Sequence, residues 1–215
     1  MTLKVVALDC DGVLFDSRQA NIAFYNQILQ HFNRPLMSPE AVDYVHSHTA
    51  RESLLYLFPN DSQFEAVWQY YRTMDYRPFI SYMVREPFLL EFLEYLRPRY
   101  GTAVATNRST TTKAVFQHHQ LEDWFDLVVS AQDVNHPKPH PESFHRILRH
   151  FQIAPREAVY IGDSLVDQEF TRNAGVRLVA YRNPGLQADY YLDSFAQGPE
   201  LIRTLAKEYS ARPNG

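Results

Sequence analysis

The sequence contains a single cysteine, no long apolar run and no excess of positive charge. Cys10 alone cannot form an internal disulfide or a cysteine-rich zinc site. No apolar stretch reaches the roughly 18 residues of a membrane-spanning helix, and the one at residues 3–8 is too short for a signal peptide. A formal net charge of −4 is unlike that of a nucleic-acid binder. We therefore expect a cytoplasmic protein that binds neither nucleic acid nor a membrane.

Hydrophobic residues make up 45% of the 215 residues, which is enough to bury a sizeable core. Short apolar runs predict strands at residues 3–8, 102–106, 127–130, 158–162 and 176–180. Helical spacing predicts helices between them, at residues 88–97, 110–119, 141–151 and 165–174, and a last helix at 199–209. This alternation is typical of an α/β fold with a doubly wound parallel sheet.

The stretch from residue 17 to residue 84 interrupts this alternation, because it has helical spacing and no clear strand. We therefore predict an α/β core formed by residues 1–16 and 85–215, with a small helical domain inserted at residues 17–84. The sequence leaves a monomer and a homodimer equally open.

Polar residues follow four of the predicted strands. In an open parallel sheet, ligands bind at the carboxyl ends of the strands, so these residues are expected to meet. They are Asp9 and Asp11 after the first strand, Thr106 and Asn107 after the second, Lys138 after the third, and Asp163 and Asp167 after the fourth.

Four carboxylates gathered in one cleft repel one another unless a cation lies between them. Oxygen ligands without thiolate or imidazole favour Mg²⁺. Lys138 and the backbone N–H groups after Thr106 could then hold an anion that faces the metal. A metal, a lysine and a hydroxyl around a carboxylate indicate phosphoryl transfer, although this reasoning does not choose which aspartate attacks.

Four segments, in this order, resemble the motifs of the haloacid dehalogenase superfamily, in particular its phosphoglycolate-phosphatase-like branch. They are Leu8-Asp9-Cys10-Asp11-Gly12-Val13-Leu14-Phe15-Asp16-Ser17, Ala105-Thr106-Asn107-Arg108-Ser109, Lys138-Pro139-His140-Pro141-Glu142-Ser143-Phe144, and Ile161-Gly162-Asp163-Ser164 with Asp167. The resemblance spans roughly residues 3 to 185, and the helical insertion matches the family's helical cap in size, class and position.

The resemblance implies a role for each of these residues. Asp9 would attack phosphorus and form an aspartyl-phosphate, and Asp11 would protonate the leaving oxygen and then activate water. Thr106 and the backbone of Asn107 would bind the phosphoryl group of a small phosphorylated substrate, and Lys138 would neutralise its charge. Mg²⁺ would be held by Asp9, the backbone carbonyl of Asp11 and Asp163, with Asp167 binding it directly or supporting its ligands.

Two arginines are candidates for binding a second anionic group of the substrate. Arg51 lies in a stretch, residues 48–54, that resembles the cap of beta-phosphoglucomutases; the alternative is an ordinary helix-start residue that pairs with Glu52 or solvent. Arg108 follows the second motif directly. The histidine pairs, such as His136 and His140, have no zinc-site context, and we interpret them as surface or capping residues.

Several functions share these motifs. A Mg²⁺-dependent phosphatase is the reading we favour. A beta-phosphoglucomutase-like phosphomutase and a non-catalytic module that binds a phosphorylated ligand remain alternatives. Two other functions are disfavoured. A 2-haloacid dehalogenase would leave Asp11 and Asp163 without a role, because it needs neither. A phosphonate hydrolase needs a lysine in the cap, and the stretch from residue 16 to residue 84 contains none. A phospho-accepting receiver domain is also disfavoured, because its acidic pair is adjacent and it has no helical insertion after its first strand. Here Cys10 separates Asp9 from Asp11, and the insertion at residues 17–84 follows the first strand.

Overall fold

The fold was analysed in a computed structural model, which describes residues 2–48, 50–59, 62–108 and 110–211. Ser109, the last residue of the second motif, lies outside the described residues. The chain divides into two compact units, one formed by residues 1–16 and 85–215 and the other by residues 17–84. We call the first the core unit and the second the helical unit.

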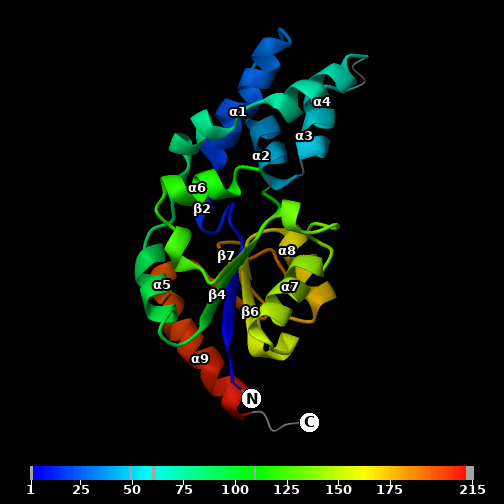
Figure 1. The fold of residues 1–215 in the computed structure, drawn as a ribbon. Helices are drawn as coiled ribbons and strands as arrows, with labels where there is room; N and C mark the ends of the chain where they lie inside the picture. The colour runs from blue at the N-terminus through cyan, green and yellow to red at the C-terminus, as the bar shows by residue number, and fades with distance from the viewer. Residues whose placement is uncertain (1, 49, 60–61, 109, 212–215) are drawn as a thin grey trace. The chain divides into compact units, whose positions relative to one another are not determined.

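The core unit is built on a six-stranded parallel sheet with the order β5-β4-β1-β6-β7-β8 (Figure 1). The strands are β1 (Val5–Leu8), β4 (Gly101–Ala105), β5 (Leu127–Val129), β6 (Ala158–Gly162), β7 (Arg177–Tyr181) and β8 (Tyr190–Leu192). The predicted doubly wound α/β fold is thus confirmed, and β8 is an edge strand that the sequence analysis missed. Two short strands, β2 (Phe15–Asp16) and β3 (Val84–Arg85), form a second sheet.

Helices cover both faces of the large sheet. On one face α7 (Glu142–Phe151) packs against β4 and β5, and α8 (Leu165–Ala174) packs against β6 and β7. On the opposite side, α5 (Leu89–Leu96) packs against β4 and against α9 (Gly198–Ala211), as Figure 1 shows. The helix α6 (Thr112–His118) follows β4.

Small strand residues let the helices approach the sheet closely. Ala7, Ala103 and Ala105 are fully buried in the same cluster as the large side chains of Phe144 and Phe170, which come from α7 and α8. Burying these aromatic rings contributes about 2 to 3 kcal/mol each, before the cost of ordering the chain. The helices α7 and α8 are therefore packed directly on the central strands.

The helical unit consists of α1 (Arg18–His31), α2 (Pro39–Ser47), α3 (Ala50–Leu57), α4 (Phe64–Thr73) and the 3₁₀ helix η1 (Arg77–Tyr82). Its centre is aromatic. The ring of Phe24 lies 5.7 Å from that of Tyr71 and 5.4 Å from that of Phe79, in both cases edge to face. Across the residues that the structure describes, no helix is long and apolar enough to cross a membrane.

Candidate active site

The strand order brings three of the predicted loops together. β1 lies between β4 and β6, and Leu8 pairs with Val104 on one side and with Ile161 on the other. The residues that follow these strands therefore meet at one edge of the sheet. The backbone N–H of Asp9 still donates to the carbonyl of Ile161, at 2.9 Å, so Asp9 continues the ladder one residue past the strand.

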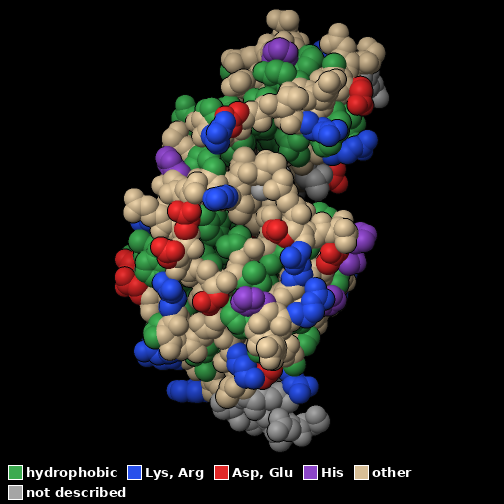
Figure 2. Space-filling view, in the orientation of Figure 1, with side chains coloured by type: hydrophobic (Ala, Val, Ile, Leu, Met, Phe, Trp, Pro, Cys, Tyr) green, Lys and Arg blue, Asp and Glu red, His purple; other side chains and the backbone are tan. Residues whose placement is uncertain are grey.

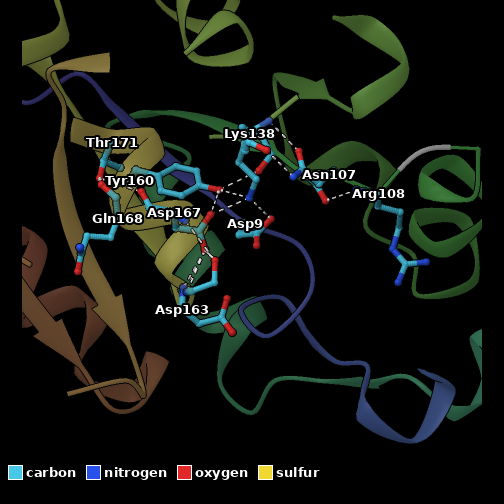
Figure 3. Close-up of polar contacts among 12 residues, drawn as sticks. Asp9, Asn107, Arg108, Lys138, Tyr160, Asp163, Asp167, Gln168 and Thr171 are labelled. Carbon is cyan, nitrogen blue, oxygen red and sulfur yellow. Dashed lines mark hydrogen bonds and ion pairs between the residues drawn. The ribbon is translucent and has the colours of Figure 1, made fainter. Parts of the chain in front are cut away.

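Lys138 reaches this edge from the loop that follows β5, two strands away from β1. Its side chain is 3% exposed, and its ammonium nitrogen lies 2.8 Å from Oδ1 of Asp9 and 2.7 Å from Oδ1 of Asp167 (Figure 3). One buried ammonium thus joins the carboxylates that follow β1 and β6. Two close ion pairs offset the cost of taking this charge out of water, which makes a buried lysine tolerable here.

The amide group of Asn107 holds the backbone of Lys138. The N–H of Lys138 donates to Oδ1 of Asn107, and Nδ2 of Asn107 donates to the carbonyl of Lys138, both at 2.8 Å. This two-point contact joins the loop after β4 to the loop after β5 (Figure 3). Asn107 was predicted to contribute its backbone, whereas the structure shows that its side chain positions the lysine.

Tyr160 is a site residue that the sequence analysis did not identify. It lies on β6 and is fully buried, and its hydroxyl accepts from the ammonium of Lys138 at 2.9 Å. The same hydroxyl donates to the carbonyl of Ala105 at 2.8 Å. A tyrosine in a buried strand is expected to be core, but its polar end needs a partner, and that need could have indicated a neighbouring ion.

Asp167 occupies the first turn of α8 and forms a capping box with Ser164. Its Oδ2 accepts from the hydroxyl of Ser164 at 2.7 Å and from the backbone N–H of Asp163 at 3.2 Å. Burial alone would raise the pKa of Asp167, but Lys138 and Ser164 hold that pKa below its usual range. Asp167 therefore stays ionised and fixes both the lysine and the start of the helix.

The carboxylates of Asp9, Asp163 and Asp167 form an acidic cluster, in which one oxygen of each lies within 4.8 Å of the others. Burial raises the pKa of Asp9 to about 7, with Asp167 adding to the shift and Lys138 opposing it. Burial, together with the charges of Asp9 and Asp167, raises the pKa of Asp163 to about 8. With all three carboxylates ionised, one lysine leaves two negative charges in excess, and the raised pKa values of Asp9 and Asp163 reflect this imbalance. That excess and the all-oxygen donor set fit a hard divalent cation.

Gly12 makes room for Asp163. Its φ of +79° lies in the left-handed region, and a Cβ built on it would lie only 2.1 Å from Oδ2 of Asp163. Glycine is required on both counts, because other residues are strained at this φ and would displace the carboxylate.

Asp11 differs from the other three aspartates, because its carboxylate is paired with Arg108. The guanidinium nitrogens Nη2 and Nε donate to Oδ1 at 2.5 Å and to Oδ2 at 3.1 Å. Nη1 of Arg108 donates to the hydroxyl of Thr111 at 3.0 Å, and the backbone N–H of Arg108 donates to Oγ1 of Thr106. The arginine side chain is only 8% exposed. Its bidentate pairing fixes the orientation of the Asp11 carboxylate.

Three further residues named in the sequence analysis are Cys10, Arg51 and Thr106. Cys10 is fully buried, and burial raises the pKa of its thiol well above the ordinary value. Arg51 is an exposed residue of α3 in the helical unit, and its guanidinium lies 6.0 Å from the ring centroid of Phe64. Thr106 is 3% exposed and directly follows β4.

Comparison with known proteins identifies the family of the chain. The curated pyrophosphatase PpaX of Bacillus mycoides is 24% identical to the chain over 191 residues, which cover 84% of each protein. A haloacid dehalogenase superfamily hydrolase of subfamily IA from Geobacter sulfurreducens superposes with a TM-score of 0.81. It is 39% identical, and the match covers 93% of this chain and 96% of that one.

Two further solved structures share the fold at lower identity. A predicted phosphoglycolate phosphatase from Haemophilus somnus has a TM-score of 0.80 at 22% identity, covering 94% of this chain and 98% of its own. A beta-phosphoglucomutase from Clostridium difficile has a TM-score of 0.76 at 19% identity, covering 99% and 100%. The sequence itself matches the haloacid dehalogenase-like hydrolases over residues 6–181, so the chain belongs to this family and is an enzyme of its phosphatase type.

Proposed function

We propose that the protein is a Mg²⁺-dependent phosphatase of a small phosphorylated metabolite and works through an aspartyl-phosphate on Asp9. The observation that carries this proposal is the buried ammonium of Lys138, which contacts Asp9 at 2.8 Å and Asp167 at 2.7 Å. This contact supports the proposal, because it puts a buried cation beside the carboxylate of Asp9 at the acidic cluster. A phosphoryl group entering there meets positive charge on its oxygens and a carboxylate at its phosphorus.

In the first step, a carboxylate oxygen of Asp9 forms a bond to phosphorus, and the bond from phosphorus to the ester oxygen breaks. Asp11 gives a proton to the departing alkoxide. In the second step, Asp11 takes a proton from water, the water oxygen bonds to phosphorus, and the bond from phosphorus to Asp9 breaks. Inorganic phosphate leaves, Asp9 is a free carboxylate again, and Asp11 again carries the proton with which it began.

The surrounding residues hold the reacting groups in place. The hydroxyl of Thr106 and the backbone after it would donate to the phosphoryl oxygens, and Lys138 would neutralise their charge. Asn107 fixes the lysine backbone, and Tyr160 fixes its ammonium nitrogen. In the protein without substrate, Arg108 holds the carboxylate of Asp11 in one orientation. A substrate anion that takes over the guanidinium would free Asp11 to carry the proton that it transfers.

The acidic cluster fits Mg²⁺, with Asp9, Asp163 and the backbone carbonyl of Asp11 as the groups that would hold it. When bound, the ion supplies positive charge to the phosphoryl oxygens and to the attacking carboxylate. Asp167 acts differently in this proposal, because both of its oxygens accept hydrogen bonds from Lys138 and from residues 163 and 164. It positions the lysine and the helix start.

We further propose that Arg108 and Arg51 select the substrate. Arg108 is buried beside Asp11, and a second anionic group on the substrate would compete with Asp11 for its guanidinium. Arg51 is proposed to contact a more remote anionic group. A substrate with two anionic groups is therefore expected to be preferred over a simple monoester.

Release of inorganic phosphate from a panel of compounds tests the function. The panel contains phosphoglycolate, sugar phosphates, nucleotides and pyrophosphate, the last because the curated relative is named a pyrophosphatase. Each compound is assayed with Mg²⁺ and with EDTA. We expect Mg²⁺-dependent release that Asp9→Asn abolishes. Asp123→Asn, which changes an exposed aspartate of the 3₁₀ helix at residues 122–124, is expected to leave the release unchanged.

Other results would redirect the assignment. Release that survives in Asp9→Asn would exclude Asp9 as the nucleophile. Transfer of phosphate to a second sugar phosphate, with little free phosphate, would identify a phosphomutase, since the same aspartyl-phosphate serves both reactions. Binding of phosphorylated compounds without turnover of any of them would leave a non-catalytic module.

A further inference from the structure

We propose that His136, His140 and Glu142 form a binding site for a transition-metal ion such as Zn²⁺. The site lies on the loop that carries Lys138 and is separate from the acidic cluster. Sequence spacing gave no reason to expect it, because the two histidines lack the pattern of a known zinc motif. The third ligand becomes apparent only when the loop after β5 folds against the start of α7.

The three side chains converge in the structure. One ligand atom of each lies within 4.8 Å of the ligand atoms of the other two. The rings of His136 and His140 have centroids 4.6 Å apart, and Nδ1 of His136 lies 3.1 Å from Oε2 of Glu142. Both rings are exposed and the carboxylate is half-buried, so an ion can enter from solvent and keep water as a further ligand.

Hydrogen bonds hold the three ligands near one another before any ion binds. The carboxylate of Glu142 accepts from the backbone N–H of Asn135 at 3.0 Å and of His136 at 3.1 Å. The backbone N–H of Glu142 donates to Nδ1 of His140 at 3.3 Å. These contacts lower the conformational cost of bringing the ligands together.

The backbone between the ligands is also restricted. Every second residue of the loop is a proline, with Pro137, Pro139 and Pro141 alternating with the two histidines and Lys138. Each proline fixes its own φ and limits the residue before it. The histidines therefore sample few positions relative to Glu142, which favours binding of an ion over a random surface pair.

The donor types separate this site from the acidic cluster. Two imidazoles and one carboxylate suit Zn²⁺, Co²⁺ or Ni²⁺, whereas oxygen-only ligands suit Mg²⁺. Excess Mg²⁺ is therefore expected to fill the acidic cluster and leave the histidine site to the transition metal. His136 and His140 stand two residues on either side of Lys138, so a bound ion would join both ends of the loop that positions the ammonium.

Cobalt is the probe for this site, because Co²⁺ with imidazole ligands absorbs in the visible region. Protein without a histidine tag is dialysed against Co²⁺ in a large excess of Mg²⁺, and bound cobalt is measured by elemental analysis and by its spectrum. The variants are His136→Ala and His140→Ala. His145→Ala, an exposed histidine one turn into α7, is the matched control, and Asp163→Asn disables the acidic cluster.

We expect one equivalent of Co²⁺ in the parent protein, in His145→Ala and in Asp163→Asn, and at least a tenfold weaker affinity in His136→Ala and His140→Ala. The bound ion should raise the melting temperature of the parent and not that of the two histidine variants. The proposal is wrong if excess Mg²⁺ removes all bound cobalt, or if the cobalt stays bound when either His136 or His140 is replaced. Activity in Mg²⁺ is expected to be unaffected by either histidine variant.

Discussion

Without a bound cation, the site makes the protein less stable as the pH rises, and Asp163 is the best residue with which to measure this. Asp163 is half-buried beside two other carboxylates, and burial together with their charges raises its pKa to about 8, compared with an ordinary value of 3.8. In the folded, metal-free protein it therefore holds a proton at pH 6, whereas in the unfolded chain it does not. Asp163→Asn removes this difference, because an amide does not ionise.

The sign and size follow from proton linkage. A group whose pKa is raised in the folded state stabilises the fold fully below its unfolded pKa, and this contribution disappears as the pH rises through the folded pKa. Between pH 5 and pH 7 the folded protein binds one more proton at Asp163 than the unfolded chain does. The free energy of unfolding is then expected to fall by about 1.4 kcal/mol per pH unit, or about 2.7 kcal/mol over this range. That is a sizeable part of a typical total of about 5–15 kcal/mol.

Urea unfolding in EDTA, at half-unit steps from pH 5 to pH 9, measures this contribution. The quantity to compare is the free energy of unfolding of the parent minus that of Asp163→Asn at each pH. Other groups titrate in both proteins, so their contribution cancels in this difference. One of them is His119, whose pKa burial lowers to about 4, so that it stabilises the fold as the pH rises. We expect the difference to fall steadily up to pH 7 and to level off above pH 8. A difference that stays constant or rises from pH 5 to pH 7 would refute the reasoning.

Three further predictions concern the same site. Replacing Lys138 by Met removes the cation between buried carboxylates, so we expect loss of phosphate release and a decrease of about 3–5 kcal/mol in the free energy of unfolding in urea; an unchanged midpoint would contradict this. Arg108→Gln is expected to lower kcat/KM for phosphoglycolate by at least about tenfold more than for ethyl phosphate, which has no second anion; equal losses would mean that Arg108 only orients Asp11. Gly12→Ala pushes a methyl group against Asp163, so calorimetric titration is expected to show weaker Mg²⁺ binding, and an unaltered affinity would count against Asp163 as a ligand.

The sequence was sufficient for features that depend on local pattern. The parallel sheet followed from apolar runs that alternate with helical spacing, and it is confirmed by the strand order. β8 was missed because only three residues form it and they pair solely with the edge of β7.

The site depends on contacts between distant segments, which the pattern along the chain does not encode. Asp11 and Arg108 are 97 positions apart, and their pairing requires two strands to lie side by side. Lys138 was predicted at the site, but nothing in its loop indicated that its ammonium would be buried between Asp9 and Asp167. The side-chain role of Asn107 was missed for the same reason, because its partner is 31 residues away.

The amide of Asn107 that pairs with the backbone of Lys138 has a consequence for engineering. Because the lysine is anchored from the neighbouring loop, a graft of the loop after β5 that leaves Asn107 behind would lose this anchor. Residues 131–135 are not a free linker before it, because Ala131–Asp133 form a 3₁₀ helix and the backbone N–H of Asn135 donates to Glu142. The loops after β4 and β5 therefore have to be transferred together.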